Sequence, residues 1–380
     1  MDIFGILSMI GGLALFLYGM EAMGAGLSKL SGGRMERLLE KLTSKRIMAV
    51  LLGAGVTAVI QSSSATTVMV VGFVNSGIMK LNQAVGIIMG ANIGTTITSW
   101  LLSLTGIQGS SFILKMLKPS SFSPILAIVG IIFIMFTKDE KKKDIGGIFL
   151  GFAILMYGME AMSGAVAPLA DNEKFTGILT MFSNPILGLL AGTILTAVIQ
   201  SSSASVGILQ ALCATGAVNF STALPIIMGQ NIGTCVTAII SSIGTSKNAK
   251  RAAAVHLFFN ISGTVIFMVV FYTLNTFVHF SFLNTAASPA GIAVIHSLFN
   301  IGATILLFPF ANLLEKMAIL AIPDKGSEVE EMEEEKINPD LARLDERFLD
   351  KPGFAMEECR GVAINMARKS KKAMNLAIDL

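Results

Sequence analysis

The heptapeptide VIQSSSA occurs twice in this chain, at Val59–Ala65 and at Val198–Ala204. Both copies lie inside long apolar stretches, where three serines and a glutamine are costly to bury unless they find polar partners. Because the same polar segment returns in the same apolar setting, we expect it to be a functional feature. The sequence around it shows what kind of fold contains it.

The composition predicts an all-α polytopic membrane protein. Hydrophobic residues make up 53% and charged residues 14% of the 380 residues, against about 25% charged residues in soluble domains. Several uncharged runs, such as Ile3–Met20 and Ala252–Leu274, approach or exceed the ~18 residues of a transmembrane helix. No basic segment precedes Ile3–Met20, so we interpret it as the first span and not as a signal peptide.

A constant offset of 139 residues relates two halves of the chain. GLALFLYGMEAM at Gly12–Met23 returns as GFAILMYGMEAM at Gly151–Met162. IIMGANIGTTIT at Ile87–Thr98 returns as IIMGQNIGTCVT at Ile226–Thr237. Three blocks, VIQSSSA included, keep one register, which indicates two copies of one structural unit. A weaker echo relates AVHLFFNISGT, from residue 254, to VIHSLFNIGAT, from residue 294.

The arms beside each QSSS segment are too short to cross a membrane. Ile47–Ile60 is about 21 Å long as a helix, whereas the hydrocarbon core is about 30 Å thick. We therefore predict two re-entrant hairpins, at residues 47–79 and 186–218. The expected spans are 3–23, 83–105, 122–137, 145–165, 222–243, 252–274 and 290–312.

Loop charges predict the orientation of the two units. With both hairpins re-entrant, the loops on one side hold every Lys and Arg of residues 1–322 except Lys115, Lys118 and Lys174. The positive-inside rule assigns that side to the cytoplasmic face of the inner membrane, which puts the N-terminus outside and the C-terminus inside the cell. Three crossings then separate the two unit starts, so the second unit is inverted, a recurring plan of secondary transporters.

We divide the chain into four regions. They are a first transmembrane repeat at 1–144, a second repeat plus an extra span at 145–316, an acidic linker at 317–338 and a cytoplasmic helical tail at 339–380. Each repeat also contains a glycine pair around an asparagine, at Gly90 and Gly94 and at Gly229 and Gly233. Such pairs allow either close backbone approach or a break in the helix.

The chemistry of the tips favours anion and cation binding together. Where a hairpin turns, one arm ends in free carbonyls and the next begins with free N–H groups. No Lys, Arg, Asp or Glu lies inside either hairpin. A multivalent anion would therefore need a cation bound beside it to offset its charge in a low dielectric. We expect Na+ as the coupling ion and no other cofactor. The three cysteines lack ligand or disulfide spacing, so no further metal is expected.

These blocks resemble the type II sodium/phosphate cotransporters, including the bacterial Na/Pi symporters, over about residues 5–315. The resemblance implies sodium-coupled phosphate transport by alternating access, with the QSSS segments at the centre. Carried over residue by residue, and combined with the tip chemistry, it gives two sets of candidates. The phosphate candidates are Ser62, Ser63, Ser64, Ser201, Ser202, Ser203, Asn92 and Asn231. The sodium candidates are Gln61, Ser62, Thr95, Gln200, Ser201 and Thr234.

The sequence departs from the family pattern in one place. The family often carries an H-x-F-F-N block in each unit, but here only the second unit has it, at His256–Asn260, while the first has FILKMLKPSSF. This leaves the number of coupled sodium ions open. The tail from residue 341 resembles the start of the PhoU-like domain of bacterial members.

Other polar residues have a structural and a functional interpretation. Glu21 and Glu160 are repeat equivalents that we expect near span ends or in polar contacts between helices, with ion binding as the alternative. His256 and His296 each have an asparagine four residues later, which favours polar helix contacts over ion binding.

The sequence leaves several alternatives open. A symporter of sulfate, a dicarboxylate or an amino acid fits the same tips, since helix N-termini accept any oxyanion. An intramembrane serine hydrolase is disfavoured because G-x-S-x-G is absent, so we expect no enzyme. The expected partners are phosphate, Na+ and membrane lipid, without nucleic acid, and the oligomeric state is open, a homodimer included.

Overall fold

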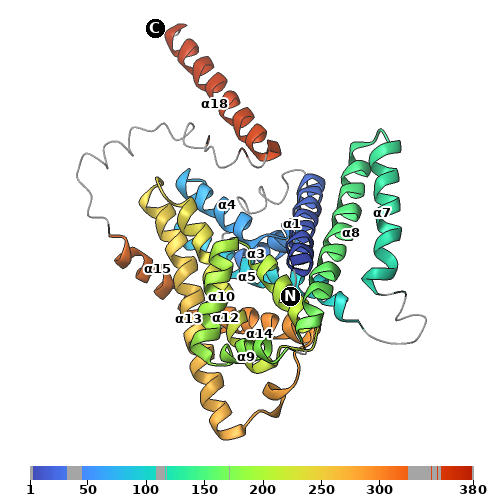
Figure 1. Cartoon of the computed structure of the whole chain (residues 1–380). Coiled ribbons are helices and arrows are strands. Elements are labelled where there is room, and N and C mark those ends of the chain that lie inside the picture. The colour runs from blue at the N-terminus through green and yellow to red at the C-terminus, as the bar shows by residue number, and fades with distance from the viewer. Residues whose placement is uncertain are drawn as a thin grey trace.

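The computed structural model describes residues 3–31, 45–107, 116, 118–170, 172–323, 344, 349 and 352–378, and these are almost entirely helical. Figure 1 shows most helices in one bundle, with α1, α8 and α7 on one side of it. The helices are α1 (Ile3–Ser31), α3 (Arg46–Ile60), α4 (Ser63–Asn75), α5 (Leu81–Ser103), α7 (Pro119–Phe136), α8 (Glu140–Val166), α9 (Glu173–Met181), α10 (Pro185–Ile199), α11 (Ser202–Cys213), α12 (Phe220–Ser241), α13 (Lys247–Val278), α14 (Pro289–Leu307), α15 (Ala311–Ala321) and α18 (Pro352–Ile378). Short 3-10 turns follow α5, α8, α13 and α14.

Seven stretches of the described chain are long and apolar enough to cross a membrane. They are Ile3–Ser31, Leu81–Gly106, Pro119–Phe136, Glu140–Leu169, Phe220–Ser241, Lys247–Val278 and Pro289–Ala321. Each corresponds to one of the seven spans expected from the sequence. The prediction of an all-α polytopic membrane protein is therefore confirmed.

Two pairs of short helices lie where the hairpins were predicted. In the first pair, α3 has 15 residues and α4 has 13. In the second pair, α10 has 15 residues and α11 has 12. At 1.5 Å per residue each arm is about 18–22 Å long, too short for a span. The entry of these arms from one side of the membrane stays a prediction.

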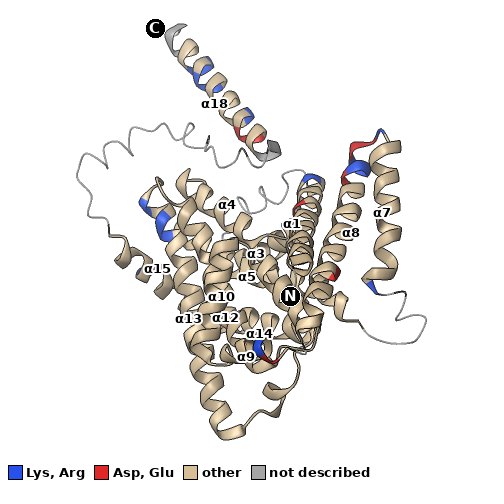
Figure 2. Cartoon of the chain, in the orientation of Figure 1, with Lys and Arg blue, Asp and Glu red and all other residues tan. Residues whose placement is uncertain are grey.

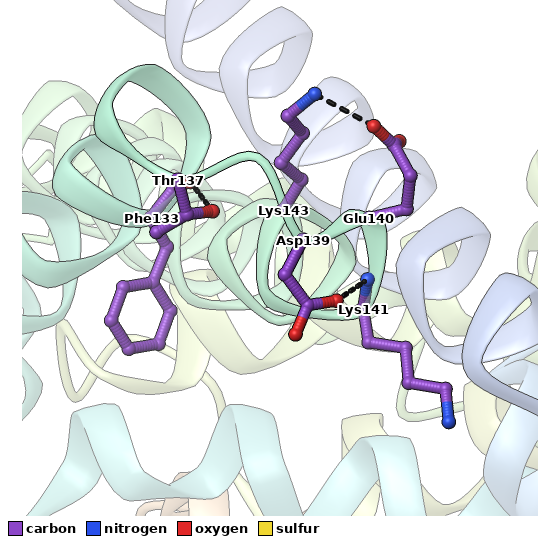
Figure 3. A network of polar contacts seen from close by, with 6 residues as sticks. All are labelled: Phe133, Thr137, Asp139, Glu140, Lys141 and Lys143. Atoms are coloured by element: carbon purple, nitrogen blue, oxygen red, sulfur yellow. Dashed lines mark hydrogen bonds and ion pairs between the residues drawn. The ribbon is translucent and has the colours of Figure 1, made fainter.

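The connection between α7 and α8 differs from the sequence prediction. The expected spans 122–137 and 145–165 leave residues 138–144 between them as a connection, but α8 begins at Glu140. Figure 3 shows the cause: the carboxylate of Asp139 accepts the backbone N–H of Lys141 at 3.0 Å, and Lys143 pairs with Glu140 at 2.7 Å. An aspartate N-cap and an acidic first turn stabilise a helix start. The predicted boundary at 144/145 therefore falls inside α8, and the one at 316/317 falls inside α15.

The glycine pairs bring helices together and do not break them. Helices α5 and α12 are continuous through Gly90, Gly94, Gly229 and Gly233. A Cβ on Gly90 would overlap the carbonyl oxygen of Val50 in α3, and a Cβ on Gly229 would overlap the equivalent carbonyl in α10. Of the two interpretations of these glycines, close approach is right and a broken helix is wrong.

Helices α1 and α8, which correspond in the two repeats, pack antiparallel with exchanged contacts. Gly12 lies against the backbone of Met162, and Met23 lies against Gly151. Adding 139 to Gly12 gives Gly151, and adding 139 to Met23 gives Met162, so the two contacts are related by exchange of the repeats. The contacts of Gly19 with Leu155 and of Phe16 with Gly158 are related in the same way. This two-fold relation supports the predicted inversion.

Basic residues gather toward one end of the helices. Figure 2 shows blue at the last turn of α1 and at the starts of α8 and α13, all toward the upper end of the view, where α18 also lies. The starts of α7 and α9, which carry Lys118 and Lys174, lie lower. The same division was predicted from loop charge, and the assignment of the upper end to the cytoplasm stays a prediction.

Candidate functional site

Both hairpin tips have the same backbone geometry. Gln61 ends α3 in the left-handed region at φ 61°, and Gln200 ends α10 at φ 58°. The N–H of each glutamine donates to the carbonyl of a threonine four residues earlier at 2.7 Å. Glycine is the usual residue at such a position because a Cβ is strained there. A glutamine kept at this position in both repeats points to a use for its side chain.

The serines have two different roles at each tip. Ser62 and Ser201 are N-caps, whose Oγ atoms accept the backbone N–H three residues later at 3.1 and 3.2 Å. Ser63 and Ser202 are the first helical residues of α4 and α11. Each tip thus places the N-terminal end of one helix, with its free N–H groups, beside the C-terminal end of another.

The two tips come together in the structure. The hydroxyl of Ser64 lies 3.5 Å from the carbonyl oxygen of Gln200, although 136 residues separate them. Helices α5 and α12 each reach the tip of their own repeat: Thr98 donates to Oε1 of Gln61 at 2.9 Å, and Thr237 donates to the carbonyl of Gln200 at 3.4 Å. Thr98 and Thr237 were not among our candidates, although their spacing of three residues from Thr95 and Thr234 was a usable signal.

The remaining candidates on α5 and α12 are buried and bond back to their own helices. The side-chain amides of Asn92 and Asn231 each donate to the carbonyl four residues earlier at 2.9 Å. The hydroxyls of Thr95 and Thr234 donate in the same manner at 3.2 and 2.9 Å. Each amide nitrogen uses one of its two N–H groups in this bond, so Asn92 and Asn231 still offer one donor and one oxygen acceptor each.

Helix α14 contacts α5 of the first repeat through a threonine, as α13 contacts α12 of the second repeat. The hydroxyl of Thr264 in α13 lies 3.5 Å from the carbonyl of Met228. The hydroxyl of Thr304 in α14 lies 3.4 Å from the carbonyl of Met89, which is the repeat equivalent of Met228. The weak echo between the two helices thus reflects equivalent packing, and the block missing from the first unit in sequence is replaced by α14.

The histidines and glutamates fall into two environments. His256 and His296 are 1% exposed, and the asparagine four residues after each donates to its backbone carbonyl at 3.0 and 2.8 Å. Both ring nitrogens of His256 and Nδ1 of His296 have no hydrogen-bond partner among the described residues, so polar contacts of the rings with other helices stay a prediction. Glu21 and Glu160 are exposed, so neither is part of the buried polar residues around the tips.

Comparison with known proteins identifies the family of the chain. The chain matches the family described as Na+/Pi-cotransporter over residues 15–164 and 154–288. Protein YqeW of Bacillus subtilis is 29% identical over 315 residues, which cover 82% of this chain and 97% of that protein. The putative inorganic phosphate export protein YjbB of Salmonella typhimurium is 27% identical over 84% of this chain, which spans only 56% of that relative.

A shorter match extends to mammals. The sodium-dependent phosphate transport protein 2A of Rattus norvegicus is 39% identical over 113 residues, 28% of this chain and 17% of that protein. No solved structure matches the chain. The family match covers both repeats and both tips, and the chain therefore belongs to the Na+/Pi-cotransporter family.

Proposed function

We propose that this protein is a sodium-coupled symporter of inorganic phosphate in the inner membrane. The observation that carries the proposal is the meeting of two polar, uncharged hairpin tips, at Ser64 and Gln200, in a chain with seven apolar stretches long enough to cross a membrane. The names of two relatives, one a phosphate exporter and one a sodium-dependent phosphate transporter, support the substrate.

The chemistry of the tips supports binding of both ions. Helix N-termini at Ser63 and Ser202 supply N–H groups for phosphate. The carbonyl ends of α3 and α10, together with side-chain oxygens, supply ligands for Na+, a use of interrupted helices that recurs in transporters. With no charged residue inside either hairpin, sodium is the positive charge that allows a phosphate to enter.

Alternating access follows from the duplication. The exchanged contacts of α1 and α8 support two inverted repeats around one central site. Two such units can rock against each other so that the site opens to either side in turn. Because ion gradients then set the direction of flux, a relative named for export and a relative named for sodium-dependent transport fit one mechanism.

The experiment is uptake into proteoliposomes. Purified protein is reconstituted, and entry of radiolabelled phosphate is measured with an inward gradient of Na+, K+ or choline. We expect uptake only with Na+, at least tenfold above protein-free liposomes. Equal uptake in all three salts would show that transport is not coupled to sodium.

Competition distinguishes the second candidate, a sodium-coupled carrier of another oxyanion. Helix N-termini bind sulfate and carboxylates as well as phosphate. We expect unlabelled phosphate to block uptake of label, and equimolar sulfate or succinate to leave it within about twofold. The reverse order would assign the protein to the other oxyanion.

A further inference from the structure

The two hairpins, so similar in backbone, differ in how their polar side chains are satisfied. In the first hairpin, Thr57 of α3 donates to the hydroxyl of Thr66 in α4 at 2.9 Å, and Thr66 donates to the carbonyl of Ser62 at 3.1 Å. These bonds tie the two arms together just behind the tip. Both threonines are 0% exposed.

The second hairpin has the same positions but not the same bonds. Thr196 and Ser205 are the repeat equivalents of Thr57 and Thr66, and both are 0% exposed. Neither hydroxyl has a hydrogen-bond partner among the described residues. A buried hydroxyl left without a partner is costly, so two of them on the two arms of one hairpin indicate that something else satisfies them.

The side chains of the two tip glutamines also differ in whether they form hydrogen bonds. The side chain of Gln61 is folded onto the first tip: its amide nitrogen donates to the carbonyl of Ala58, and its oxygen accepts from Thr98. Gln200 is exposed, and within the described chain its side chain makes no hydrogen bond. The side chain of Gln61 therefore bonds within the first tip, whereas at the second tip the carbonyl of Gln200 accepts, among the described residues, only from Thr237 and Ser64 of other helices.

The surroundings of Thr196 limit what can occupy this place. A Cβ on Gly233 of α12 would lie 2.7 Å from the Cβ of Thr196, so the threonine is pressed against the NIGT segment. Ser205 is one methyl group smaller than Thr66. A group that binds between the arms is therefore small, accepts oxygen ligands and lies near the negative end of the α10 dipole. These properties describe a dehydrated monovalent cation.

We propose that Thr196 and Ser205 form a sodium site in the second hairpin that has no counterpart in the first. The proposal rests on the proposed function for the identity of the cation, and it assigns coupling by this ion to one repeat only. The Thr-to-Ser difference between positions 66 and 205 is the sequence difference between the two hairpins at this place.

The test uses ion-dependent stability, which needs no transport. The unfolding temperature of the purified full chain is measured against NaCl, KCl and choline chloride at constant ionic strength. A ligand that binds only the folded state raises this temperature as its concentration passes its Kd. We expect stabilisation by Na+ above K+ and choline. Equal stabilisation by all three salts would overturn the proposal and leave a buried water at the site.

Two reciprocal variants locate the site. Ser205→Thr rebuilds the bonded pair of the first hairpin, so we expect the half-saturating Na+ concentration to rise at least tenfold. Thr66→Ser, the matched control in the first hairpin, leaves that concentration within about twofold. An unchanged Ser205→Thr variant, or an equal shift in both variants, would refute the proposal.

Thr196→Val is the variant that tests the site if Ser205→Thr fails to fold. It keeps the branched Cβ against Gly233 and removes one hydroxyl, so we again expect a rise of at least tenfold. If the wild-type protein transports no phosphate but the variants lose their stabilisation by Na+, the proposed function is wrong and the sodium site stands. If the wild-type protein shows sodium-driven transport but the variants keep its sodium affinity, the sodium site is wrong and the proposed function stands.

Discussion

Gln61 and Gln200 have a left-handed backbone conformation that favours glycine. Because glutamine is strained in this conformation, replacing single residues here has a predictable effect. Replacing Gln200 by glycine removes the strain of a left-handed Cβ, which is about 1–2 kcal/mol, and its side chain makes no hydrogen bond within the described chain. We expect Gln200→Gly to unfold at an equal or higher temperature and to lose phosphate uptake.

Gln61→Gly is the informative comparison. It gains the same relief of strain but loses the bonds of its side chain to Ala58 and Thr98, so its stability should stay closer to wild type, while uptake is again lost. Normal uptake by Gln200→Gly would show that this side chain is not part of the site.

At the scale of elements, the packing of α3 on α5 depends on glycine where the backbones touch. A methyl group on Gly90 would overlap the carbonyl oxygen of Val50, whereas a methyl group on Gly55 of α3 meets nothing within 4 Å. We expect Gly90→Ala to lower the yield of folded protein in detergent, as other overpacked sites do at a cost of about 1–3 kcal/mol.

Gly55→Ala is the control for helix propensity. It lies in the same pair of helices and is expected to stabilise α3 by about 0.5–1 kcal/mol, since alanine loses less entropy than glycine in a helix. Size-exclusion profiles and unfolding temperatures measure both variants. If Gly90→Ala behaved like Gly55→Ala, the close approach of α3 and α5 would be wrong.

At the scale of the whole molecule, one buried side chain joins the two repeats. The amide nitrogen of Gln210 in α11 donates to the carbonyl and hydroxyl of Ser99 in α5 and to the carbonyl of Pro289 in α14, at 3.0–3.2 Å. Loss of such bonds leaves buried acceptors unpaired, at a cost of about 1–3 kcal/mol. We expect Gln210→Leu to lower the unfolding temperature clearly.

Gln230→Leu is the matched control for Gln210→Leu. Gln230 is 1% exposed, and neither side-chain atom has a partner among the described residues. Replacing it by leucine breaks no hydrogen bond of the described chain, so the unfolding temperature should fall less than in Gln210→Leu. A fall of equal size in both variants would mean that the bonds of Gln210 add no stability beyond that of a buried side chain.

The inverted arrangement makes its own prediction at this scale. Lys80 and Asn219 are repeat equivalents that precede α5 and α12. In a background free of Cys213, Cys235 and Cys359, we expect a membrane-impermeant maleimide to label Asn219→Cys in intact cells. Lys80→Cys should react only in inside-out vesicles. Labelling of both positions from the same side would rule out inversion.

Sequence patterns alone were enough to predict the class of the protein, its seven apolar spans and its duplication. These are properties of hydropathy and of repeated residues, which act within a segment or between copies of it. The sequence also located the ends of the hairpin arms, because QSSS interrupts an apolar pattern. It misplaced the start of α8, where the capping carboxylate of Asp139 outweighed the appearance of a charged loop.

Which segments meet could be read only from the packed helices. The contact of Ser64 with Gln200, the replacement of a missing block by α14 and the bond between Thr57 and Thr66 all join residues on different helices. Such contacts depend on how helices pack, and two segments of the same local pattern can pack differently. For that reason the hydroxyls of Thr196 and Ser205, nearly identical in sequence to the bonded pair, find no partner among the residues that the structure describes.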